Sequence, residues 1–384
     1  MGDVMNRLLI LDTTLRDGEQ GIGNVMTLTQ KAGILEQLNR LPLDLIEIGF
    51  PASSEEDVKW ARLAATMSMR AKPVVFARPI AADLEKTISA TENFESIQYQ
   101  LLGTGSEIHQ ELKRKLSLDR LMSELENAVV LLRSAGRNDI SVILEDATRG
   151  SAALLKEVVT QVSSLGVRSI TLADTVGYAV PGEISDMISS IRDCIGPDVS
   201  LGIHCHNDLG LATANSLSAL SSGASLIQGT MGGLGERAGN CALEEIITIL
   251  QYKQQWGVTH AEFDLQVVHD VAHQIHQIIG KSVALTKPIL GEHVFSTAAG
   301  LHQNGILKAP EVYEYLSPLD FGRQRKFIFN RLSGRTLLRT ALRDVDDADL
   351  DRFNSWLLDL REEVESKNLP DYFERFKLTE RSKA

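Results

Sequence analysis

Short apolar runs alternate with longer amphipathic segments along the chain up to residue 254. The apolar runs are rich in Val, Ile and Leu, as buried parallel strands are, and the segments between them have the apolar spacing of helices that pack on a sheet. Eight units of this kind over roughly 250 residues predict a closed (βα)8 TIM barrel, since an open doubly wound sheet usually has fewer strands. The predicted strands are Leu8–Leu15, Leu43–Phe50, Lys72–Arg78, Ser96–Gly103, Asp139–Asp146, Ser169–Asp174, Ser200–Asp208 and Leu226–Gly233.

The predicted helices carry boundary signals. Several have Ser, Thr or Pro near the start and Gly soon after the end, and Pro181 stands where a first-turn proline is favoured. They include Thr29–Arg40, Leu118–Ala135, Ala152–Leu165, Gly182–Cys194 and Leu211–Ser222.

The pattern changes after residue 254. Lys287–His293 contains Pro and Gly and is typical of a linker, and a mixed segment then leads to an acidic helical tail from about Thr336. We therefore expect a catalytic barrel over residues 1–254. Residues 255–384 are expected to form a linker and a smaller, mainly helical region that covers the barrel mouth.

Composition narrows the range of partners. The formal net charge of -12 does not favour binding to nucleic acid or to an anionic membrane. No apolar run approaches the roughly 18 residues that a membrane helix needs. The three cysteines, Cys194, Cys205 and Cys241, form no CxxC pair, and the N-terminus lacks the apolar core of a signal peptide. We expect a reduced, cytoplasmic protein that acts on a small molecule.

Polar residues gather at the carboxyl ends of the predicted strands, which is where TIM barrels carry their chemistry. Random placement would scatter these residues over both ends, so the pattern predicts one polar site at the top of the barrel. The strand-end residues are Arg16 and Asp17, Glu47, Arg78, Glu145, Thr175, His204 and His206, and Asn240.

His204 and His206 predict a metal site within this cluster. Residues at i and i+2 of a strand point to the same face, so the two imidazoles project together. A single strand histidine is more often a buried packing residue, but Asp17 and Asn240 stand at neighbouring strand ends. Two imidazoles and a carboxylate suit a divalent ion such as Zn²⁺, Mn²⁺ or Mg²⁺, which would polarise a carbonyl as a Lewis acid.

Other histidines and a glycine-rich segment give weaker signals of a functional site. His269, His273 and His276 share a helical spacing, but no nearby motif adds a fixed ligand, so we interpret them as packing residues. His302 stands among glycines in an expected loop, where function concentrates. The glycine-rich segment 232–240 lacks the GxGxxG spacing of a dinucleotide site, and its Glu-Arg pair, 236–237, fits a solvated pair or a brace equally well.

Six motifs, in order along residues 8–335, resemble those of the 2-isopropylmalate synthase and homocitrate synthase family of metal-dependent TIM-barrel enzymes. One such motif would be weak evidence, whereas six in register are specific. They are Asp12–Gln20, Glu47–Ala52, Glu145–Arg149, Asp174–Tyr178, His204–Gly210 and Gly235–Asn240.

The resemblance implies an acyltransferase that joins acetyl-CoA to a 2-oxo acid by Claisen condensation and then hydrolyses the thioester. It implies a homodimer in which the C-terminal region of one subunit completes the site of its partner. The implied metal ligands are Asp17, His204 and His206, with Asn240 as a further or outer ligand. The implied catalytic residues are Arg16, Glu145, His302 and Tyr313, and the implied substrate-binding residues are Arg16, Glu47, Arg78, Gln100 and Thr175.

The chain departs from the family pattern in places. Thr297–Ala299 replaces a segment that carries a carboxylate near the implied base, and Gln100 and Leu332 stand where relatives carry histidine. The chain also ends soon after its helical tail, so feedback inhibition by leucine is not expected. The residues 50–54 and the strand-seven motif resemble the isopropylmalate branch of the family, but the substrate stays open, with those of homocitrate and phosphonomethylmalate synthases as alternatives.

Two rival hypotheses differ in kind. A lyase related to hydroxymethylglutaryl-CoA lyase would share the first and seventh strand motifs, but its catalytic cysteine is missing from Leu234–Arg237. A barrel without activity that serves as a binding partner is supported only by the altered Thr297–Ala299 segment. Retention of the implied metal ligands and catalytic residues favours the condensing enzyme.

Overall fold

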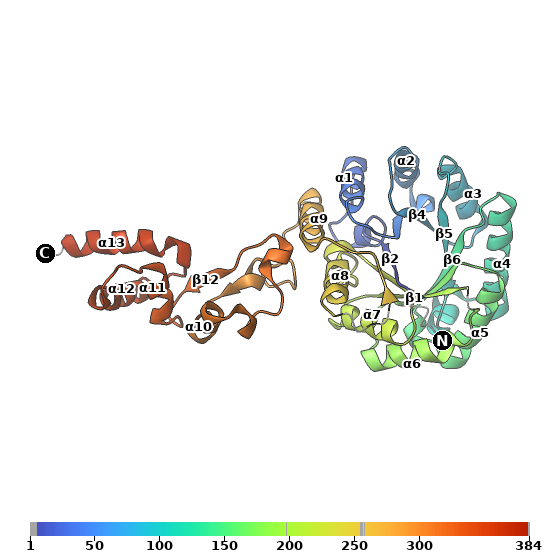
Figure 1. Ribbon diagram of the computed structural model, residues 1–384. Helices are drawn as coiled ribbons and strands as arrows, with labels where there is room; N and C mark the ends of the chain where they lie inside the picture. Colours follow the sequence, from blue (N-terminus) through green and yellow to red (C-terminus); the bar gives the residue numbers. More distant parts are fainter. Residues whose placement is uncertain (1–5, 197, 254–255, 257, 383–384) are drawn as a thin grey trace. The chain divides into compact units, whose positions relative to one another are not determined.

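The computed structural model describes residues 6–382 except 197, 254–255 and 257 (Figure 1). The chain forms two compact units, Met1–Phe263 with Asp270–Ser282, and Asp264–His269 with Val283–Ala384. The predicted boundary at residue 254 lies outside the described residues. Among the described helices, none is long and apolar enough to cross a membrane.

The first unit is a closed barrel of eight parallel strands, which confirms the predicted fold (Figure 1). Each strand pairs with the next in sequence, and β2 closes the ring by pairing with β9. The strands are β2 (Leu9–Asp12), β3 (Leu45–Gly49), β4 (Lys72–Ala77), β5 (Gln98–Thr104), β6 (Ile140–Glu145), β7 (Ser169–Asp174), β8 (Ser200–Cys205) and β9 (Leu226–Gly229). A separate pair joins β1 (Asn6–Arg7) to β10 (Val258–Thr259).

The barrel helices follow their strands, and four of them begin after a side-chain cap. Thr27, Ser54, Ser117 and Ser151 each accept a backbone N–H of the first turn, and such caps contribute about 1 kcal/mol each. The helices are α1 (Leu28–Leu38), α2 (Glu55–Ala64), α3 (Ala81–Ala90), α4 (Leu118–Ser134), α5 (Ala152–Ser164), α6 (Pro181–Arg192), α7 (Ala212–Ser221) and α8 (Leu243–Tyr252). Short helical turns are η1 (Gly18–Gln20), η2 (Pro51–Ser53), η3 (His109–Arg114), η4 (Ala147–Arg149) and η5 (Met231–Gly233).

The first, seventh and eighth predicted strands extend too far, because the strands end at Asp12, Cys205 and Gly229 instead of Leu15, Asp208 and Gly233. The regular strand β8 ends at Cys205, and His206 instead forms an isolated antiparallel bridge with Asn240. The backbone leaves the ladder here because Asn207 N–H donates to the carbonyl of Gly239 in the loop after β9. His206 therefore lies just beyond the strand, although its side chain still points to the same side as that of His204.

The barrel interior is layered, because alternate residues of each strand point inward. The lower part of the interior holds the apolar cluster of Leu11, Leu45, Val74 and Leu226 together with buried polar residues such as Gln98 and Ser169. A buried polar layer with Glu47, Gln100, Thr171 and Gln228 lies two residues further along the strands. The next layer reaches the carboxyl ends of the strands, where the candidate site lies.

The second unit has a small three-stranded sheet and a helical core. Strand β11 (Ser296–Thr297) pairs in parallel with β12 (Lys326–Phe329), which pairs antiparallel with β13 (Val364–Glu365). Its helices are α10 (Gly300–Lys308), α11 (Arg335–Ala341), α12 (Asp347–Leu360) and α13 (Leu369–Arg381), with turns η7 (Glu292–Phe295), η8 (Pro310–Val312), η9 (Pro318–Phe321) and η10 (Ser366–Asn368). Helix α9 (Leu265–Ile278) contributes residues to both units.

The expected acidic helical tail is confirmed, but the expected loop around His302 is wrong. His302 lies in the first turns of α10. The glycines serve close packing here, because a Cβ on Gly305 would lie 2.6 Å from the Tyr313 ring and one on Gly300 would lie 2.7 Å from Gly334 N. The same glycines that predict a loop thus allow a helix to approach its neighbours.

Candidate functional site

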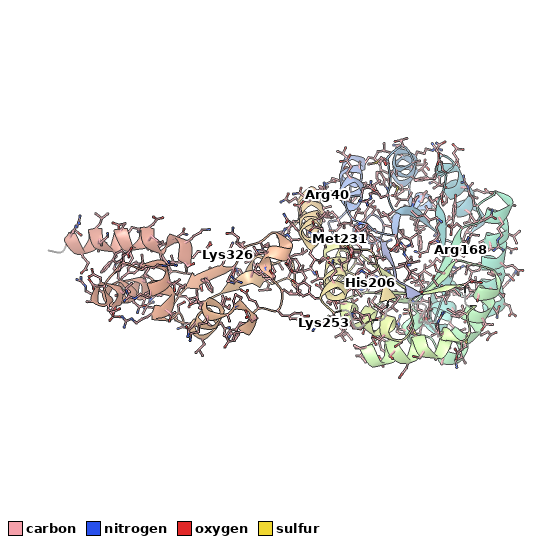
Figure 2. All side chains as sticks on the ribbon, viewed as in Figure 1. Arg40, Arg168, His206, Met231, Lys253 and Lys326 are labelled. Carbon is pink, nitrogen blue, oxygen red and sulfur yellow. The ribbon has the colours of Figure 1, made fainter. Side chains whose placement is uncertain are left out.

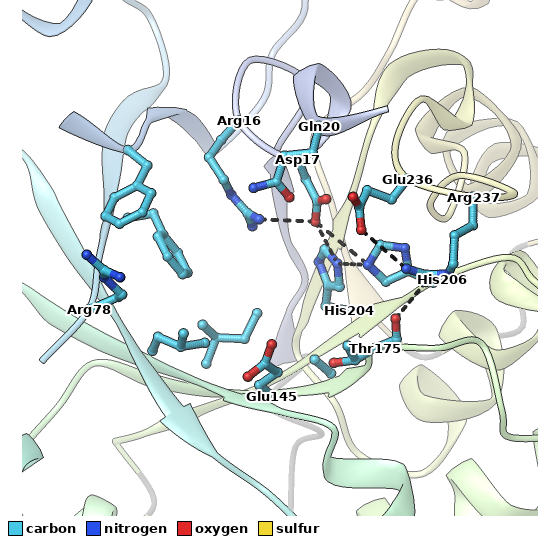
Figure 3. A pocket seen from close by; sticks show the side chains of 15 residues that line it. Arg16, Asp17, Gln20, Arg78, Glu145, Thr175, His204, His206, Glu236 and Arg237 are labelled. Carbon is cyan, nitrogen blue, oxygen red and sulfur yellow. Dashed lines mark hydrogen bonds and ion pairs between the residues drawn. The ribbon is translucent and has the colours of Figure 1, made fainter. Parts of the chain in front are cut away.

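A pocket of about 260 Å³ opens at the carboxyl ends of the barrel strands (Figure 3). Residues from the turns after β2 and β3, from strands β4 to β8 and the positions just after them, and from the loop after β9 line it. The lining residues are Arg16, Asp17, Gln20, Phe50, Phe76, Arg78, Leu102, Ile143, Glu145, Ala173, Thr175, His204, His206, Glu236 and Arg237. The predicted location of the site therefore coincides with a pocket among the described residues.

Asp17, His204 and His206 converge on one point of this pocket (Figure 3). Asp17 Oδ2 lies 3.0 Å from Nε2 of His204 and 4.0 Å from Nε2 of His206, and the two Nε2 atoms are 3.4 Å apart. All three side chains are buried. Figure 2 labels His206 on the first unit among all the side chains of the chain.

The local backbone explains how Asp17 reaches this point. Asp12, the last residue of β2, accepts hydrogen bonds from the backbone N–H and the hydroxyl of Thr14, each at 2.9 Å. The carbonyl of Thr13 then accepts the backbone N–H groups of Arg16 and Asp17. This tight turn directs both side chains over the barrel mouth.

The electrostatics of the triad suit a divalent cation. Burial opposes ionisation of Asp17, but Arg16 and the two histidines outweigh it and hold its pKa well below the ordinary value. Burial and then the neighbouring His204 lower the pKa of His206 to about 4, so this imidazole is neutral at pH 7. An ionised carboxylate beside neutral imidazole is the protonation state that metal binding requires.

Asn240 stands beside the triad, with its backbone bridged to that of His206. Its Nδ2 donates to the carbonyl of Leu234 at 2.9 Å, which fixes the amide. Its Oδ1 is buried and has no hydrogen-bond partner among the described residues. A carbonyl oxygen in that condition fits the predicted role as a further or outer ligand, which stays a prediction.

Arg16 is the buried cation of the pocket. Its Nε donates to Glu47 Oε2 at 2.7 Å, its Nη1 lies 3.3 Å from Asp17 Oδ2, and its guanidinium lies 4.8 Å from the Phe76 ring centroid. Burial alone would lower the pKa of Arg16, but the carboxylates of Glu47 and Asp17 raise it above its ordinary value. The guanidinium is therefore fixed and charged at the pocket wall.

Glu47 and Gln100 do not line the pocket but lie in the buried layer below it. Gln100 Nε2 donates to Glu47 Oε1 at 2.8 Å, and Gln228 Nε2 donates to Gln100 Oε1 at 2.7 Å. Both oxygens of Glu47 are thus occupied, one by Arg16 and one by Gln100. In this arrangement Gln100 supports Arg16 from below, and its expected direct contact with substrate stays a prediction.

Glu145, Thr175 and Arg78 line the pocket as predicted from their strand ends. Thr175 Oγ1 accepts the backbone N–H of Asp146 at 2.8 Å, which leaves its own hydroxyl hydrogen for another acceptor. Arg78 makes two ion-paired contacts with Asp83 and lies 5.6 Å from the Phe50 ring centroid. The positive charge of Arg78 is therefore already paired with a carboxylate of the protein.

The wall beneath Arg78 is apolar. Phe76, Ile143 and Ala173 form a buried cluster, and Phe50 and Leu102 pack against it. The rings of Phe50 and Phe76 meet edge to face with centroids 5.2 Å apart. Sequence reasoning missed most of this wall. Four of its members occupy inward positions of neighbouring strands and alternate with outward residues, and Phe50 directly follows β3.

Two further pairs of residues gained roles only in the structure. Arg237 donates to Asp208 Oδ1 at 2.7 Å and to the carbonyl of Thr175 at 2.7 Å, so it braces the loops after β7, β8 and β9. His109 and Lys113, on the turn η3, both contact Glu145. The sequence left two interpretations of the 236–237 pair, a solvated pair or a brace. For Arg237, these contacts favour the brace.

Comparison with known protein families identifies the family of the chain. Residues 7–275 match the family described as HMGL-like, and residues 289–354 match a domain described as homocitrate synthase post-HMGL domain-like. The chain belongs to the HMGL-like family. The resemblance drawn from the six sequence motifs is thereby confirmed.

Relatives within the HMGL-like family include proteins named 2-isopropylmalate synthase. The protein of that name from Haemophilus influenzae is 32% identical over 363 residues, covering 92% of this chain and 70% of the relative. The one from Nitrosomonas europaea is 36% identical over 341 residues, covering 88% of this chain and 67% of the relative. Among solved structures, hydroxymethylglutaryl-CoA lyase from Pseudomonas aeruginosa superposes with a TM-score of 0.61 at 18% identity, covering 73% of this chain and 95% of that one, which supports the fold.

His302 and Tyr313 lie in the second unit of this HMGL-like chain. Their rings stack with centroids 4.2 Å apart, and both side chains are exposed. Both residues fall within the matched post-HMGL domain. Their catalytic roles stay predictions.

Proposed function

We propose that the protein condenses acetyl-CoA with a 2-oxo acid that has an apolar side chain, and then hydrolyses the CoA thioester. The observation that carries this proposal is the division of the pocket. One half holds the Asp17, His204 and His206 triad with Arg16, and the other half is the apolar wall of Phe50, Phe76, Leu102, Ile143 and Ala173.

The polar half supplies what a 2-oxo acid needs. A divalent ion such as Zn²⁺, Mn²⁺ or Mg²⁺, held by Asp17, His204 and His206 with Asn240 nearby, would act as a Lewis acid toward the keto group. Arg16 is fixed by Glu47 and stabilises the negative charge that develops on the keto oxygen. Thr175 has a hydroxyl hydrogen to donate to the carboxylate of the oxo acid.

Acid–base chemistry requires a group that removes a proton from the methyl of acetyl-CoA, which is a weak carbon acid. Glu145 lines the pocket and belongs to this network in the proposal. His302 acts as the base and Tyr313 assists it, both from the C-terminal region of the partner subunit in a homodimer. The stacked rings of these two residues present them as one exposed unit that is suited to enter another site.

The apolar half and the charge pairing favour an uncharged side chain on the oxo acid. Within the described pocket, each lining arginine already has a carboxylate partner: Arg16 with Glu47, Arg78 with Asp83 and Arg237 with Asp208. A second carboxylate or a phosphonate on the oxo acid would lie against the apolar wall, and no unpaired arginine of the described pocket would neutralise its charge. Burying an unpaired charge is costly. This argues against homocitrate and phosphonomethylmalate chemistry.

A panel of 2-oxo acids tests the substrate. With Mn²⁺ or Mg²⁺ and acetyl-CoA, CoA release followed with a thiol reagent is expected for 3-methyl-2-oxobutanoate and 4-methyl-2-oxopentanoate. The kcat/KM for 2-oxoglutarate and phosphonopyruvate is expected to be at least ~100-fold lower, equivalent to ~3 kcal/mol for an unpaired buried charge. Equal rates with a dicarboxylic acid would overturn the apolar assignment, and silence with every acid would overturn the condensing function.

Shortening the apolar wall tests where the side chain binds. Ile143→Ala is expected to lower kcat/KM for the best branched oxo acid by about 10-fold, mostly through KM, because lost apolar contacts weaken ground state and transition state alike. Val142→Ala, one residue earlier and facing away from the pocket, is the matched control for the loss of core volume. Equal effects of the two changes would show that the wall does not contact the substrate.

A further inference from the structure

Glu145 is held from one side by His109 and Lys113, which the proposed reaction does not use. Lys113 Nζ lies 2.6 Å from both Oε1 and Oε2 of Glu145, and His109 Nδ1 lies 3.0 Å from Oε2. Glu145 is the last residue of β6 and lines the pocket. Its carboxylate is therefore fixed by a separate element, the turn η3, which follows β5.

The turn η3 is built to keep these two side chains together. It is a π-helical turn, His109–Arg114, and such turns are rare and often found at functional sites. His109 and Lys113 are four positions apart, so both side chains leave the same face of the turn. The turn ends at Arg114, and the next residue, Lys115, has a φ of 54°, which is unusual for a residue with a side chain.

The start of η3 is fastened to the strand that carries Glu145. Ser106 Oγ accepts the backbone N–H of His109 at 3.1 Å and donates to Asp146 Oδ2 at 2.6 Å. Asp146 directly follows Glu145 and adopts a left-handed φ of 61°. The end of β6 and the turn η3 are thus tied at Asp146 as well as at Glu145.

Global stability is a poor explanation for the contact between Lys113 and Glu145. The Lys113 side chain is 49% exposed, and ion pairs of exposed groups contribute little to folding. Orientation is a better explanation, because Lys113 engages both oxygens and His109 engages one of them. A carboxylate has about four acceptor positions, so Oε1 keeps one that is free to act in the pocket.

We propose that Lys113 and His109 are positioning residues that hold Glu145 in one orientation at the pocket. The proposal deepens the proposed function and rests on it, because the orientation matters when Glu145 takes part in proton transfer. A misplacement of about 1 Å in a catalytic group can cost about 100-fold in rate. Substrate binding, which depends on other residues of the pocket, is expected to change little.

Kinetics of two variants test the proposal. Lys113→Met is expected to lower kcat by about 10- to 100-fold while the KM values for acetyl-CoA and the oxo acid stay within about threefold of the wild-type values. Lys113→Arg retains a cation and is expected to restore most of kcat. Lys86→Met is the matched control, because Lys86 pairs with Glu55 at 2.9 Å outside the pocket and its loss should not affect turnover.

A double variant separates positioning from other roles. If Lys113 acts only through Glu145, then Lys113→Met is expected to have no further effect in the Glu145→Gln background. Likewise, His109→Asn keeps a side-chain donor and should retain more kcat than His109→Leu. Wild-type kcat in Lys113→Met, or a further loss in the Glu145→Gln background, would overturn the proposal.

A structural readout keeps this test independent of the proposed reaction. If the wild-type protein releases no CoA with any oxo acid, the proposed function fails, whereas the positioning role is still decided by crystallography. Glu145 is expected to have one orientation in wild-type crystals and an altered or divided one in Lys113→Met crystals. An unchanged Glu145 in that variant would overturn the positioning role whatever the reaction.

Discussion

Replacing His204 by Ala is expected to remove tight binding of divalent metal and to abolish CoA release. His204 Nε2 lies 3.0 Å from Asp17 Oδ2 and 3.4 Å from His206 Nε2, so its loss leaves two of the three converging donors. Loss of an outer partner of a metal ligand typically costs 10- to 100-fold in affinity, so loss of a ligand is expected to cost at least about 100-fold. Titration calorimetry with Mn²⁺ measures the affinity separately from turnover.

His293→Ala is the matched control for this substitution, because His293 is an exposed histidine of the second unit. Its metal affinity and turnover are expected to equal those of the wild type. Wild-type metal binding in His204→Ala would refute the triad as the metal site.

Arg16→Met is expected to reduce kcat by about 100- to 1,000-fold, which is the usual cost of removing a donor that stabilises developing oxyanion charge. The change also leaves the carboxylate of Glu47 buried without its ion-pair partner, since Glu47 is completely buried. Breaking a buried pair in this way typically costs 3–5 kcal/mol, so the free energy of unfolding is expected to fall by about that amount. Activity and stability would therefore both be lost.

A second change separates the two losses. Glu47→Gln in the Arg16→Met background replaces the unpaired charge by a neutral amide of the same size, so most of the unfolding free energy is expected to return. Turnover is not expected to return, because the guanidinium is still absent. Recovery of kcat in the double variant would show that Arg16 serves structure alone; denaturant unfolding and the CoA-release assay measure the two quantities.

The barrel was predictable because its signal is repeated. Eight apolar runs, each followed by an amphipathic segment, place polar residues at the same end of every strand, and one misplaced boundary does not disturb that pattern. The exact strand ends were less predictable. Strand β8 stops at Cys205 because residues around His206 pair with the loop after β9, which is a contact distant in sequence.

The triad and Arg16 were predictable for the same reason, whereas the depth of each residue within the barrel was not. Gln100 and Leu102 are both inward-facing on β5, but only Leu102 reaches the pocket. Two residues along a strand are one layer in a barrel, and a sequence pattern does not mark where one layer ends. The position of Gln100 below the pocket follows from its pairing with Gln228 on β9.

The contacts around Glu145 show a different limit. Lys113 and Glu145 are 32 residues apart, and no periodicity relates them. Only the fold brings β5, its following turn and the end of β6 together. His302 shows the reverse case, because local glycines favoured a loop where packing against Tyr313 and Gly334 allows a helix.

Below the candidate site the barrel interior is filled by buried side chains, both apolar ones such as Leu45 and Leu226 and polar ones such as Gln98 and Ser169. A TIM barrel of this kind is a packed core and not a pore. In the proposed reaction both substrates would therefore approach the triad from the carboxyl ends of the strands. A substrate that binds deeper in the pocket would then have to enter before the other one and leave after it.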